Sequence, residues 1–461
     1  MLTKEQAEDI FNRIRKLTTA QDVEAIFHGG KSALTRFANS VIHQNVAEES
    51  YSVSVRTQFG GRTARASTNK FDDDSLRSVV SASERLAEVQ HEDSDLLPMP
   101  TPSEAGISTI SSPSRYFEAT AQLTPEERAG AVSKIVRIAE EHKFTAAGIF
   151  ANTESVEGIF SSRGVNRWHR QTSADMSITM IASDASGWQK ANVTDVSKLD
   201  PERLARIAAQ KAKESAHPRE VPPGKYTVIM EPAAVLDIVG FMFSDFGGLA
   251  ILDQRSFLNN RVGKKLFGTN INIWDDVDHP LQAGPGFDGE GVNRKRLQLV
   301  EKGEVKRLVF SRGTAEKIRH SEYRDSAGPI ETTGHGFPVP NEMGEAPLNI
   351  VFGEPDVPKS VEQMISDTER GILVTRFWYI REVEPYKKIM TGMTRDGTFY
   401  IENGRIKCGV KNLRFNESLL HMLSNVREMS HPVRASGEES FDMVAPAMKV
   451  DGFNFTEVTK F

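Results

Sequence analysis

Residues Thr391–Leu420 read TGMTRDGTFYIENGRIKCGVKNLRFNESLL, and this stretch decides the fold class of the C-terminal half. Its dipeptides Asp396-Gly397 and Asn403-Gly404 are typical of turns, because glycine tolerates a positive φ without a Cβ clash. The segments after them, Thr398–Glu402 and Arg405–Val410, are short enough to be strands. The stretch therefore predicts tight antiparallel hairpins and a sheet-rich C-terminal half with no obvious catalytic group.

The rest of the chain combines helices with strands. A charged amphipathic helix opens the chain, alternating strands follow, and a further helix is predicted over Ser75–Val89, after three acids suited to a helix N-terminus. Another helix is predicted over Thr124–His142, with Thr124 as its N-cap. Because strands and helices do not alternate strictly, the fold class is α+β. We expect an N-terminal antiparallel sheet with helices, linked to a β-rich C-terminal domain of antiparallel hairpins.

Composition breaks divide the 461 residues, a length that suits two or three domains at roughly 100–200 residues each. The predicted parts are an N-terminal α+β domain (1–95), a Pro- and Ser-rich linker (96–113), a central α+β segment (114–220) and a C-terminal β-rich domain (221–461).

The charge and cysteine content exclude several classes of protein. A net charge of -6 and a pI of about 6.1 indicate no general nucleic-acid or anionic-membrane footprint. The opening residues lack the apolar core of a signal peptide. The longest near-apolar run, Ala233–Phe243, falls far short of the roughly 20 residues that span a bilayer. One cysteine, Cys408, cannot form an intrachain disulfide. We therefore expect a cytoplasmic protein with no membrane or direct nucleic-acid partner.

Two glycine motifs only partly match nucleotide sites. Gly30-Lys31-Ser32 resembles the end of a phosphate-binding loop, but Ala25 stands where the first glycine is required, so a hairpin turn is favoured. Gly284, Gly286 and Gly289 match G-x-G-x-x-G, yet no strand precedes them and no helix follows. A loop whose glycines approach something closely is the better interpretation.

The polar groups that suggest chemistry have plainer explanations. The run DDVDH (275–279) offers oxygens to a hard cation, but the EF-hand spacing is absent and a solvated turn is predicted. His335 lies between glycines, and a lone loop histidine without a fixed partner is more often surface than catalyst. Cys408 has no local protease signature, so it is expected to pack as a small hydrophobe in a strand.

A zinc peptidase places two histidines on one helix face and a glutamate beside them. The sequence contains neither H-E-x-x-H nor H-E-x-x-x-H, and its single His-Glu pair, His91-Glu92, is followed by DSDLLP. No catalytic residue and no metal ligand is therefore predicted in this chain.

Several blocks in order resemble the TldD/TldE (PmbA) metallopeptidase family. They are LTRFANSVIHQN (Leu34–Asn45), VRTQFGGRTARASTN (Val55–Asn69), LDQRSFLNNRVGKKLFGTNINIWDD (Leu252–Asp276), PGFDGEGV (Pro285–Val292), LVEKGEVKRLVFSRGTA (Leu299–Ala315), PLNIVFGEPDVPKSVEQMISDTERGILV (Pro347–Val374) and the hairpin stretch quoted first. The resemblance covers essentially the whole chain. It implies a cytoplasmic peptidase complex that acts on unfolded peptides, and its links to modulation of DNA gyrase are implied by resemblance only.

The family has two subunit types. The TldD type carries H-E-x-x-x-H on a helix and a cysteine ligand near the C-terminus, and the TldE type lacks both. The corresponding helix here, Glu231–Phe246, has no histidine, and the late segment Arg434–Val450 has no cysteine. Cys408 lies earlier and does not match that ligand. The chain thus resembles the TldE type, with no cofactor of its own and zinc expected in a partner subunit.

The first hypothesis is therefore a non-zinc-binding subunit that helps to form a substrate channel. Its expected partner is a TldD-like zinc-binding homologue, or a second copy in a homodimer, and its expected substrate is an unfolded peptide added to a strand edge. The expected substrate-binding residues lie in two glycine-containing loops: Gly284, Gly286, Gly289, Gly334, His335 and Gly336.

Two other hypotheses remain open. One is a stand-alone peptide-binding or assembly protein, a homodimer with no peptidase activity. The other is a metal-independent hydrolase that uses Cys408 or His335. Chelator-resistant cleavage by the chain alone, lost in Cys408→Ala, would favour the second of these.

Overall fold

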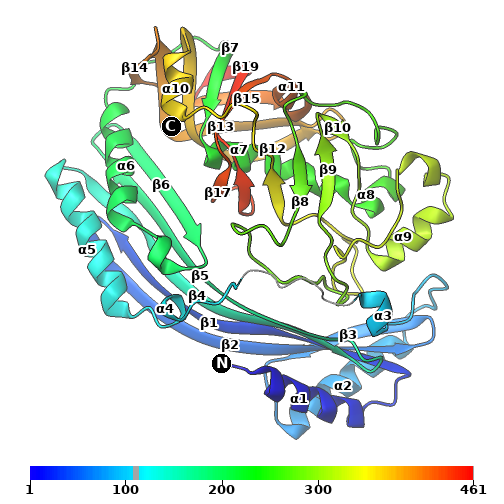
Figure 1. The fold of residues 1–461 in the computed structure, drawn as a ribbon. Coiled ribbons are helices and arrows are strands. Elements are labelled where there is room, and N and C mark those ends of the chain that lie inside the picture. The colour runs from blue at the N-terminus through cyan, green and yellow to red at the C-terminus, as the bar shows by residue number, and fades with distance from the viewer. Residues whose placement is uncertain (107–113, 460–461) are drawn as a thin grey trace.

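A long antiparallel sheet runs through both N-terminal segments of the computed structural model, which describes residues 1–106 and 114–459 (Figure 1). The strand order is β3-β2-β1-β4-β5-β6. The strands are β1 (Asp22–Ala38), β2 (Val41–Phe59), β3 (Arg62–Thr68), β4 (Thr145–Ser161), β5 (Asn166–Ile181) and β6 (Ser186–Val193). Strand β1 pairs with β4 from Glu24↔Ser161 to Phe37↔Gly148, so residues on both sides of the predicted linker share one sheet.

Two pairs of helices cover the outer face of this sheet. Helices α1 (Lys4–Leu17) and α2 (Asp73–Glu88) pack over one end, and α5 (Pro125–Glu141) and α6 (Pro201–Glu214) over the other. The predicted N-cap Thr124 is confirmed, because its side chain accepts the N–H of Glu127 in α5. Of the three acids placed at the start of the other helix, Asp72 is the N-cap of α2 and accepts the N–H of Ser75. Shorter helices are α3 (Pro102–Ala105), α4 (Glu118–Ala121) and η1 (Val196–Lys198).

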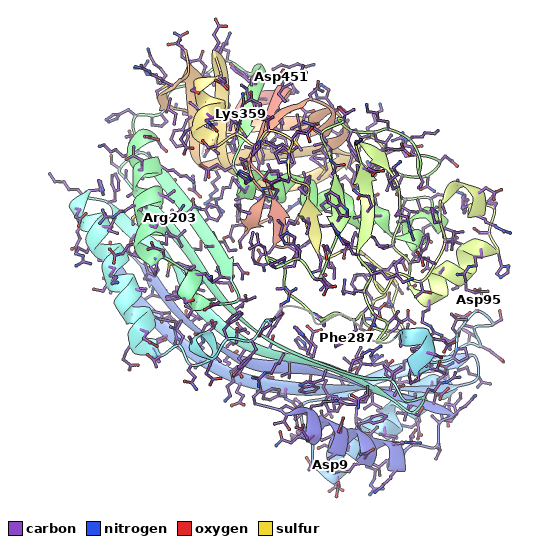
Figure 2. The ribbon with its side chains drawn as sticks, in the orientation of Figure 1. Asp9, Asp95, Arg203, Phe287, Lys359 and Asp451 are labelled. Atoms are coloured by element: carbon purple, nitrogen blue, oxygen red, sulfur yellow. The ribbon has the colours of Figure 1, made fainter. Side chains whose placement is uncertain are left out.

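Because side chains alternate along a strand, the outer and inner faces can be assigned by residue number. Val23, Ala25 and Phe27 of β1 point to the helices, so Glu24 and Ile26 point to the inner face. Figure 1 shows that the C-terminal half lies on this inner side of the curved sheet. Figure 2 places Phe287 between the sheet and the C-terminal half.

The C-terminal half contains a closed barrel. Strand β12 pairs with both β7 and β13, which closes the ring β12-β7-β19-β15-β13. Its strands are β7 (Gly224–Met230), β12 (Arg370–Glu384), β13 (Ile389–Glu402), β15 (Leu413–Ser418) and β19 (Met448–Val458), with β14 (Arg405–Gly409) and β16 (Val426–Met429) attached. The predicted α+β class with a β-rich C-terminal domain is confirmed, although β12 and β7 pair in parallel rather than as a hairpin.

A second six-stranded sheet packs against the barrel and shares its apolar core. Its order is β10-β9-β8-β11-β18-β17, from β8 (Ile273–Asp275), β9 (Leu297–Glu301), β10 (Glu304–Val305), β11 (Ile350–Phe352), β17 (Val433–Ala435) and β18 (Met443–Ala445). The helices of this half are α7 (Pro232–Val239), η2 (Gly240–Phe246), α8 (Gly248–Leu252), α9 (Arg312–Arg319), η3 (Arg324–Ser326), α10 (Val361–Ser366) and α11 (Leu419–Ser424).

The two turn dipeptides of the hairpin stretch have different outcomes. Asn403 (φ 54°) and Gly404 (φ 74°) turn β13 into β14, as predicted. The prediction of a turn at Asp396-Gly397 is wrong, because both residues lie inside β13 as a bulge opposite Thr375. Asp396 is held there by the side chains of Arg376 and Ser186.

The predicted turn at Gly30-Lys31-Ser32 is also wrong. These residues lie in the middle of β1 and pair with β2 on one side and β4 on the other. A Cβ on Gly30 would lie 1.9 Å from the carbonyl oxygen of Glu154, so glycine is needed for close approach of neighbouring strands rather than for a turn.

Two further sequence predictions concern the linker and membrane spans. Within 96–106, the linker forms α3 and buries Met99, while its residues 107–113 lie outside the described residues; the domain boundaries stay a prediction. None of the described helices is both long and apolar enough to cross a bilayer.

Candidate functional site

The two predicted glycine loops meet on the inner face of the sheet. The N–H of Gly289 donates to the carbonyl of Gly336 (2.8 Å), and the N–H of Gly336 donates to Asp288 Oδ2 (2.8 Å). Gly334 has φ +73°, and a Cβ there would lie 2.1 Å from the carbonyl oxygen of Asn293. Glycine is therefore required where the loops cross.

The other predicted residues border this crossing. The N–H of Gly284 donates to Gln171 Oε1 of β5 (2.8 Å), and the carbonyl of Gly286 accepts the N–H of Arg294 (2.9 Å). Arg65 of β3 donates to the carbonyl of Val339 at 2.9 and 3.1 Å, which anchors the second loop to the sheet. The structure thus brings the six predicted residues into one region, and their role in substrate binding stays a prediction.

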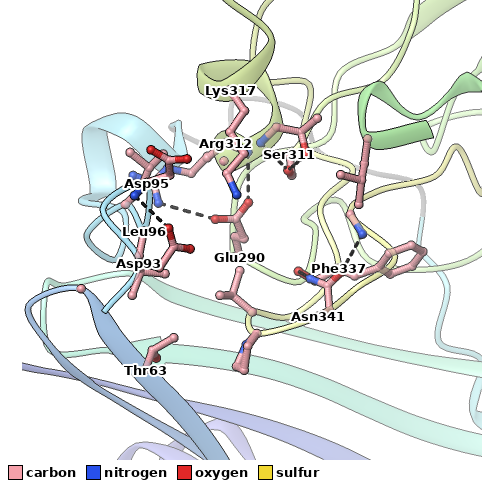
Figure 3. A pocket seen from close by; sticks show the side chains of 18 of the residues that line it. Thr63, Asp93, Asp95, Leu96, Glu290, Ser311, Arg312, Lys317, Phe337 and Asn341 are labelled. Atoms are coloured by element: carbon pink, nitrogen blue, oxygen red, sulfur yellow. Dashed lines mark hydrogen bonds and ion pairs between the residues drawn. The ribbon is translucent and has the colours of Figure 1, made fainter. Parts of the chain in front are cut away.

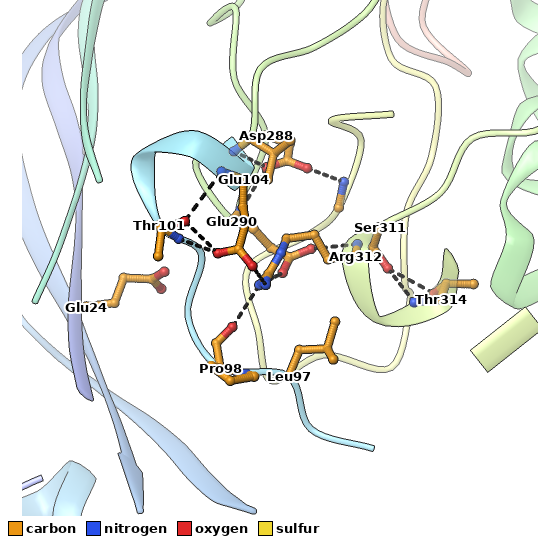
Figure 4. Close-up of polar contacts among 12 residues, drawn as sticks. Glu24, Leu97, Pro98, Thr101, Glu104, Asp288, Glu290, Ser311, Arg312 and Thr314 are labelled. Carbon is orange, nitrogen blue, oxygen red and sulfur yellow. Dashed lines mark hydrogen bonds and ion pairs between the residues drawn. The ribbon is translucent and has the colours of Figure 1, made fainter. Parts of the chain in front are cut away.

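Two buried carboxyl groups at this crossing were missed by the sequence reasoning (Figure 4). Asp288 Oδ1 accepts the N–H groups of Glu290 and Val292 (2.9 Å each). Burial raises the pKa of Asp288 to about 7, and the neighbouring Glu290 charge adds to the shift. Burial also raises the pKa of Glu290, against the opposing charge of Arg312. The acids inside the glycine motif FDGEGV were the available signal.

Arg312, the first residue of α9, links this pair to the predicted linker. Its backbone N–H donates to Glu290 Oε1 (3.1 Å), and its Nη1 lies 3.5 Å from Glu290 Oε2. Nη1 also donates to the carbonyl of Pro98 (2.9 Å), and Nη2 lies 3.9 Å from Glu104 of α3. The Arg312–Glu104 ion pair links α9 to α3, as Figure 4 shows.

A cavity of about 320 Å³ opens beside Glu290 (Figure 3). Arg312, Lys317 and Arg56 contribute positive charge to its wall, and Glu290, Asp93 and Asp95 contribute negative charge. We call it the Glu290 cavity. Its balanced charge favours no single class of ion.

His335 has a fixed partner, which corrects the prediction of a lone loop histidine. Its Nε2 lies 3.0 Å from Asp275 Oδ1 and its Nδ1 lies 3.0 Å from Thr333 Oγ1, with both ring and carboxylate buried. The Nε2–Oδ1 contact has an ion-pair distance without hydrogen-bond alignment. Burial alone would raise the pKa of Asp275, but the charges of His335 and Arg294 hold it below the ordinary value.

The hydroxyl of Thr333 is itself buried and donates to the carbonyl of Phe310, so it is no accessible nucleophile. Cys408 is partly buried in β14, the predicted strand position. Among the described residues, the hydrolase hypothesis therefore gains a fixed histidine but no accessible nucleophile beside it.

The prediction of a solvated turn at 275–279 is wrong for its first two residues. Asp275 ends β8 and is fully buried, and its Oδ2 accepts the N–H groups of Leu348 (2.8 Å) and Asn349 (2.9 Å). Asp276 is also buried and pairs with Arg296 (3.0 Å). The partners lie between 20 and 74 residues away in sequence, beyond the reach of local pattern reasoning.

The helix expected to correspond to a zinc helix does not fit the metal. It comprises α7 and η2. The carboxylate of Asp237 in α7 already accepts three backbone N–H groups, from Phe377, Glu438 and Glu439. Burial raises the pKa of Asp237 to about 6. A Cβ on Gly240 would lie 1.8 Å from Ser440 Oγ, so the late segment packs directly against this helix. Nowhere in residues 1–106 and 114–459 are three His, Cys, Asp or Glu side chains arranged to hold a metal.

A groove lies next to that late segment, between it and the inner face of the sheet. We call it the Lys190 groove; it measures about 690 Å³. Lys190 of β6 donates to the carbonyl of Gly437 (2.7 Å) and pairs with Glu438 (3.4 Å), so it links the sheet to the late segment. The sheet wall is formed by residues of β1, β2, β4, β5 and β6, among them Ile149 and Asp175.

Family models match three successive parts of the chain. Residues 223–457 match the PmbA/TldA metallopeptidase C-terminal domain, residues 23–87 match domain 1, and residues 119–216 match the central domain. The chain belongs to the PmbA/TldA metallopeptidase family. The resemblance read from the sequence blocks is thereby confirmed.

Curated relatives of this PmbA/TldA chain carry the name metalloprotease. It is 24% identical over 299 residues to a metalloprotease of Methanothermobacter thermautotrophicus, covering 60% of each chain. It is 24% identical over 277 residues to a metalloprotease of Synechocystis, covering 56% of this chain and 54% of the relative. The matches therefore span less than two thirds of these relatives.

Solved structures share the fold over nearly the full length. TldE from Thermococcus kodakarensis superposes with a TM-score of 0.84 at 18% identity, covering 98% of this chain and 100% of that one. A candidate modulator of a DNA gyrase from Thermotoga maritima superposes with a TM-score of 0.84 at 19% identity and the same coverage. At this identity the likeness concerns the fold alone.

Proposed function

We propose that this PmbA/TldA chain is a subunit without zinc of its own in a cytoplasmic peptidase complex that cleaves unfolded peptides. The observation that carries the proposal is the packing of α7 and η2 against the late segment Arg434–Val450. In place of the metal-ligating side chains that a zinc peptidase needs, this region has alkyl groups, hydroxyls and the carboxylate of Asp237, which is already hydrogen-bonded to backbone N–H groups.

The chain's own residues would bind and orient the peptide. The Lys190 groove faces the position of the late segment and offers both charged and apolar walls to an extended chain. Main-chain hydrogen bonds at a strand edge would hold the peptide without reading its sequence. The glycine loops at Gly289 and Gly336 line a separate cavity, and their contact with the peptide stays a prediction. A partner subunit would supply the metal and the activated water.

The partner is proposed to be a homologue that carries H-E-x-x-x-H, and a second copy of this chain is the other possibility. The test is cleavage of a denatured protein by the purified chain alone and after addition of the homologue. We expect no cleavage alone and chelator-sensitive cleavage from the mixture, faster than from the homologue by itself. Equal rates with and without this chain would contradict the proposal.

A stand-alone peptide-binding protein is the second candidate, and the unpaired half of β2 favours it. Strand β3 pairs with β2 from Val53 to Phe59, and within the part of the chain that the structure describes Val41–Ser52 has a strand partner on one side only. A stable homodimer that binds denatured protein and stimulates no homologue would support this candidate instead.

A further inference from the structure

A second small cavity lies under the crossing of the glycine loops, against the inner face of the sheet. We call it the Glu157 cavity; its volume is about 230 Å³. Glu157 and Ile159 of β4 form its floor, Phe287 and Arg294 come from the first loop, and His335 from the second, with Leu348 beside them. These side chains belong neither to the helix that corresponds to a zinc helix nor to the Lys190 groove.

Glu157 is a carboxyl group without a partner in the described structure. It stands between His28 of β1 and His169 of β5 in the strand register, on the same face. Within the described part of the chain, no hydrogen bond or ion pair reaches its carboxylate. Burial raises its pKa, and the charges of His28 and Arg294 oppose that shift. A half-buried acceptor left this way costs free energy unless something else donates to it.

Arg294 is the opposite charge in the same cavity. Its Nε makes one long contact, 3.4 Å, to the carbonyl of Phe287, and its Nη1 is buried without a partner among the described residues. Arg294 and Glu157 interact electrostatically but form no ion pair within 4.0 Å. Its charge also acts on the buried Asp275, but the unpartnered Nη1 leaves the guanidinium able to donate to a carboxylate.

Asp288 also lines the cavity, but its carboxyl group already accepts three backbone N–H groups. Glu157 and Arg294 are thus two unlike charges that share the cavity without pairing, which suits a ligand that carries both charges. The volume lies below the 300–1,000 Å³ of drug-sized sites, so the ligand is small. Phe287, Ile159 and Leu348 provide an apolar wall between the charges.

We propose that the Glu157 cavity binds a small zwitterion with an aliphatic side chain, a free amino acid or a dipeptide. The carboxylate of Glu157 accepts hydrogen bonds from the ligand's ammonium group, and Arg294 donates to the ligand's carboxylate. Such molecules are the end products of peptide cleavage, so a role in sensing or retaining product rests on the proposed function, whereas the binding itself does not.

The test is calorimetric titration of the full chain with leucine, leucyl-leucine and N-acetyl-leucinamide, which has the same side chain and neither charge. We expect saturable binding of at least one zwitterion and none of the blocked compound. Comparison of leucine with the dipeptide identifies which of the two sources the cavity accepts.

Two variants remove the charges singly. Glu157→Gln and Arg294→Met should each weaken binding at least tenfold, because each removes a charge-assisted contact. Glu154→Gln is the matched control, since Glu154 lies on the same strand but on the outer face, where it bonds Tyr116. Its affinity should equal that of the parent chain. Thermal unfolding establishes that each variant is folded, and a misfolded Glu157→Gln leaves Arg294→Met to decide.

The proposal is overturned if neither zwitterion binds at millimolar concentration, if N-acetyl-leucinamide binds equally well, or if the charge variants bind like the control. The titration uses no zinc and no partner. Its failure is therefore distinguishable from a failure of the proposed function, which is measured as cleavage by the mixture.

Discussion

The protonation of Asp288 should make the stability of the folded chain depend on pH. Its pKa is about 7 in the folded chain against an ordinary 3.8, so the folded state holds a proton that the unfolded state has released between these values. The contribution of Asp288 to the free energy of unfolding is therefore largest below pH 3.8, and it is lost as the pH rises to about 7. Asp288→Asn should remove that pH dependence.

Chemical denaturation between pH 4 and 8 measures this effect as the difference between parent and variant. The variant should also lose about 1 kcal/mol at every pH, because the amide nitrogen cannot accept one of the backbone N–H groups. The exposed Asp74→Asn is the control, with no change in slope. Parallel curves for the parent and Asp288→Asn would refute the assignment.

Gly336 should resist substitution for a steric reason. A Cβ there would lie 2.8 Å from Glu290 Oε1 and 3.0 Å from Ser311 Cβ, so Gly336→Ala should destabilise the chain by about 1–3 kcal/mol. A Cβ on Gly130 of α5 would meet nothing within 4 Å, so Gly130→Ala should stabilise by roughly 0.5–1 kcal/mol. Thermal or urea unfolding measures the stability change in both variants. Stability changes of the same sign and size in Gly336→Ala and Gly130→Ala would contradict this packing.

The residues of the site were only partly predictable from the sequence. The glycines were found because G-x-G-x-x-G and T-T-G-H-G-F mark positions where backbone conformation or close approach is special. His335 and Asp275 were misjudged because each is the other's partner across 60 residues, and local context shows neither burial nor charge pairing. Asp288 and Glu290 were missed for the same reason.

At the scale of elements, the free edge of β2 makes a prediction about assembly. Among the strands of residues 1–106 and 114–459, Val41–Ser52 pair with β1 alone, and most of their side chains are exposed. The segment contains neither proline nor lysine, the usual protections of an edge. We expect its outward amides to exchange rapidly in the isolated chain and to become protected when a partner or peptide adds a strand.

Hydrogen exchange followed by mass spectrometry measures that protection. Strand β4, which pairs on both sides, is the internal control and should be protected in both states. Unchanged exchange over Val41–Ser52 in an assembled, active complex would exclude this edge as the docking site.

The strands and helices themselves were predicted well where the pattern is local. Capping residues and helical spacing located α2 and α5, and Asn403-Gly404 located a turn. The pattern failed at Gly30 and at Asp396-Gly397, because glycine serves close strand pairing and a bulge as readily as a turn. Only the neighbouring strands decide between these uses.

At the scale of the molecule, the α+β class and the family were accessible from the sequence, whereas the shared sheet was not. Strand β1 pairs with β4 across more than a hundred residues and joins two segments that composition separates. That sheet places the Lys190 groove and both cavities between its inner face and the C-terminal half. The candidate site therefore exists only where the N-terminal sheet and the C-terminal half pack against each other.

The central claim is that this subunit contributes no catalytic metal. Elemental analysis of the isolated, untagged chain, followed by analysis of the active mixture, tests it most directly. We predict substoichiometric zinc in the isolated chain and zinc in the mixture that follows the amount of homologue added. One tightly bound transition-metal ion per isolated chain would contradict the account.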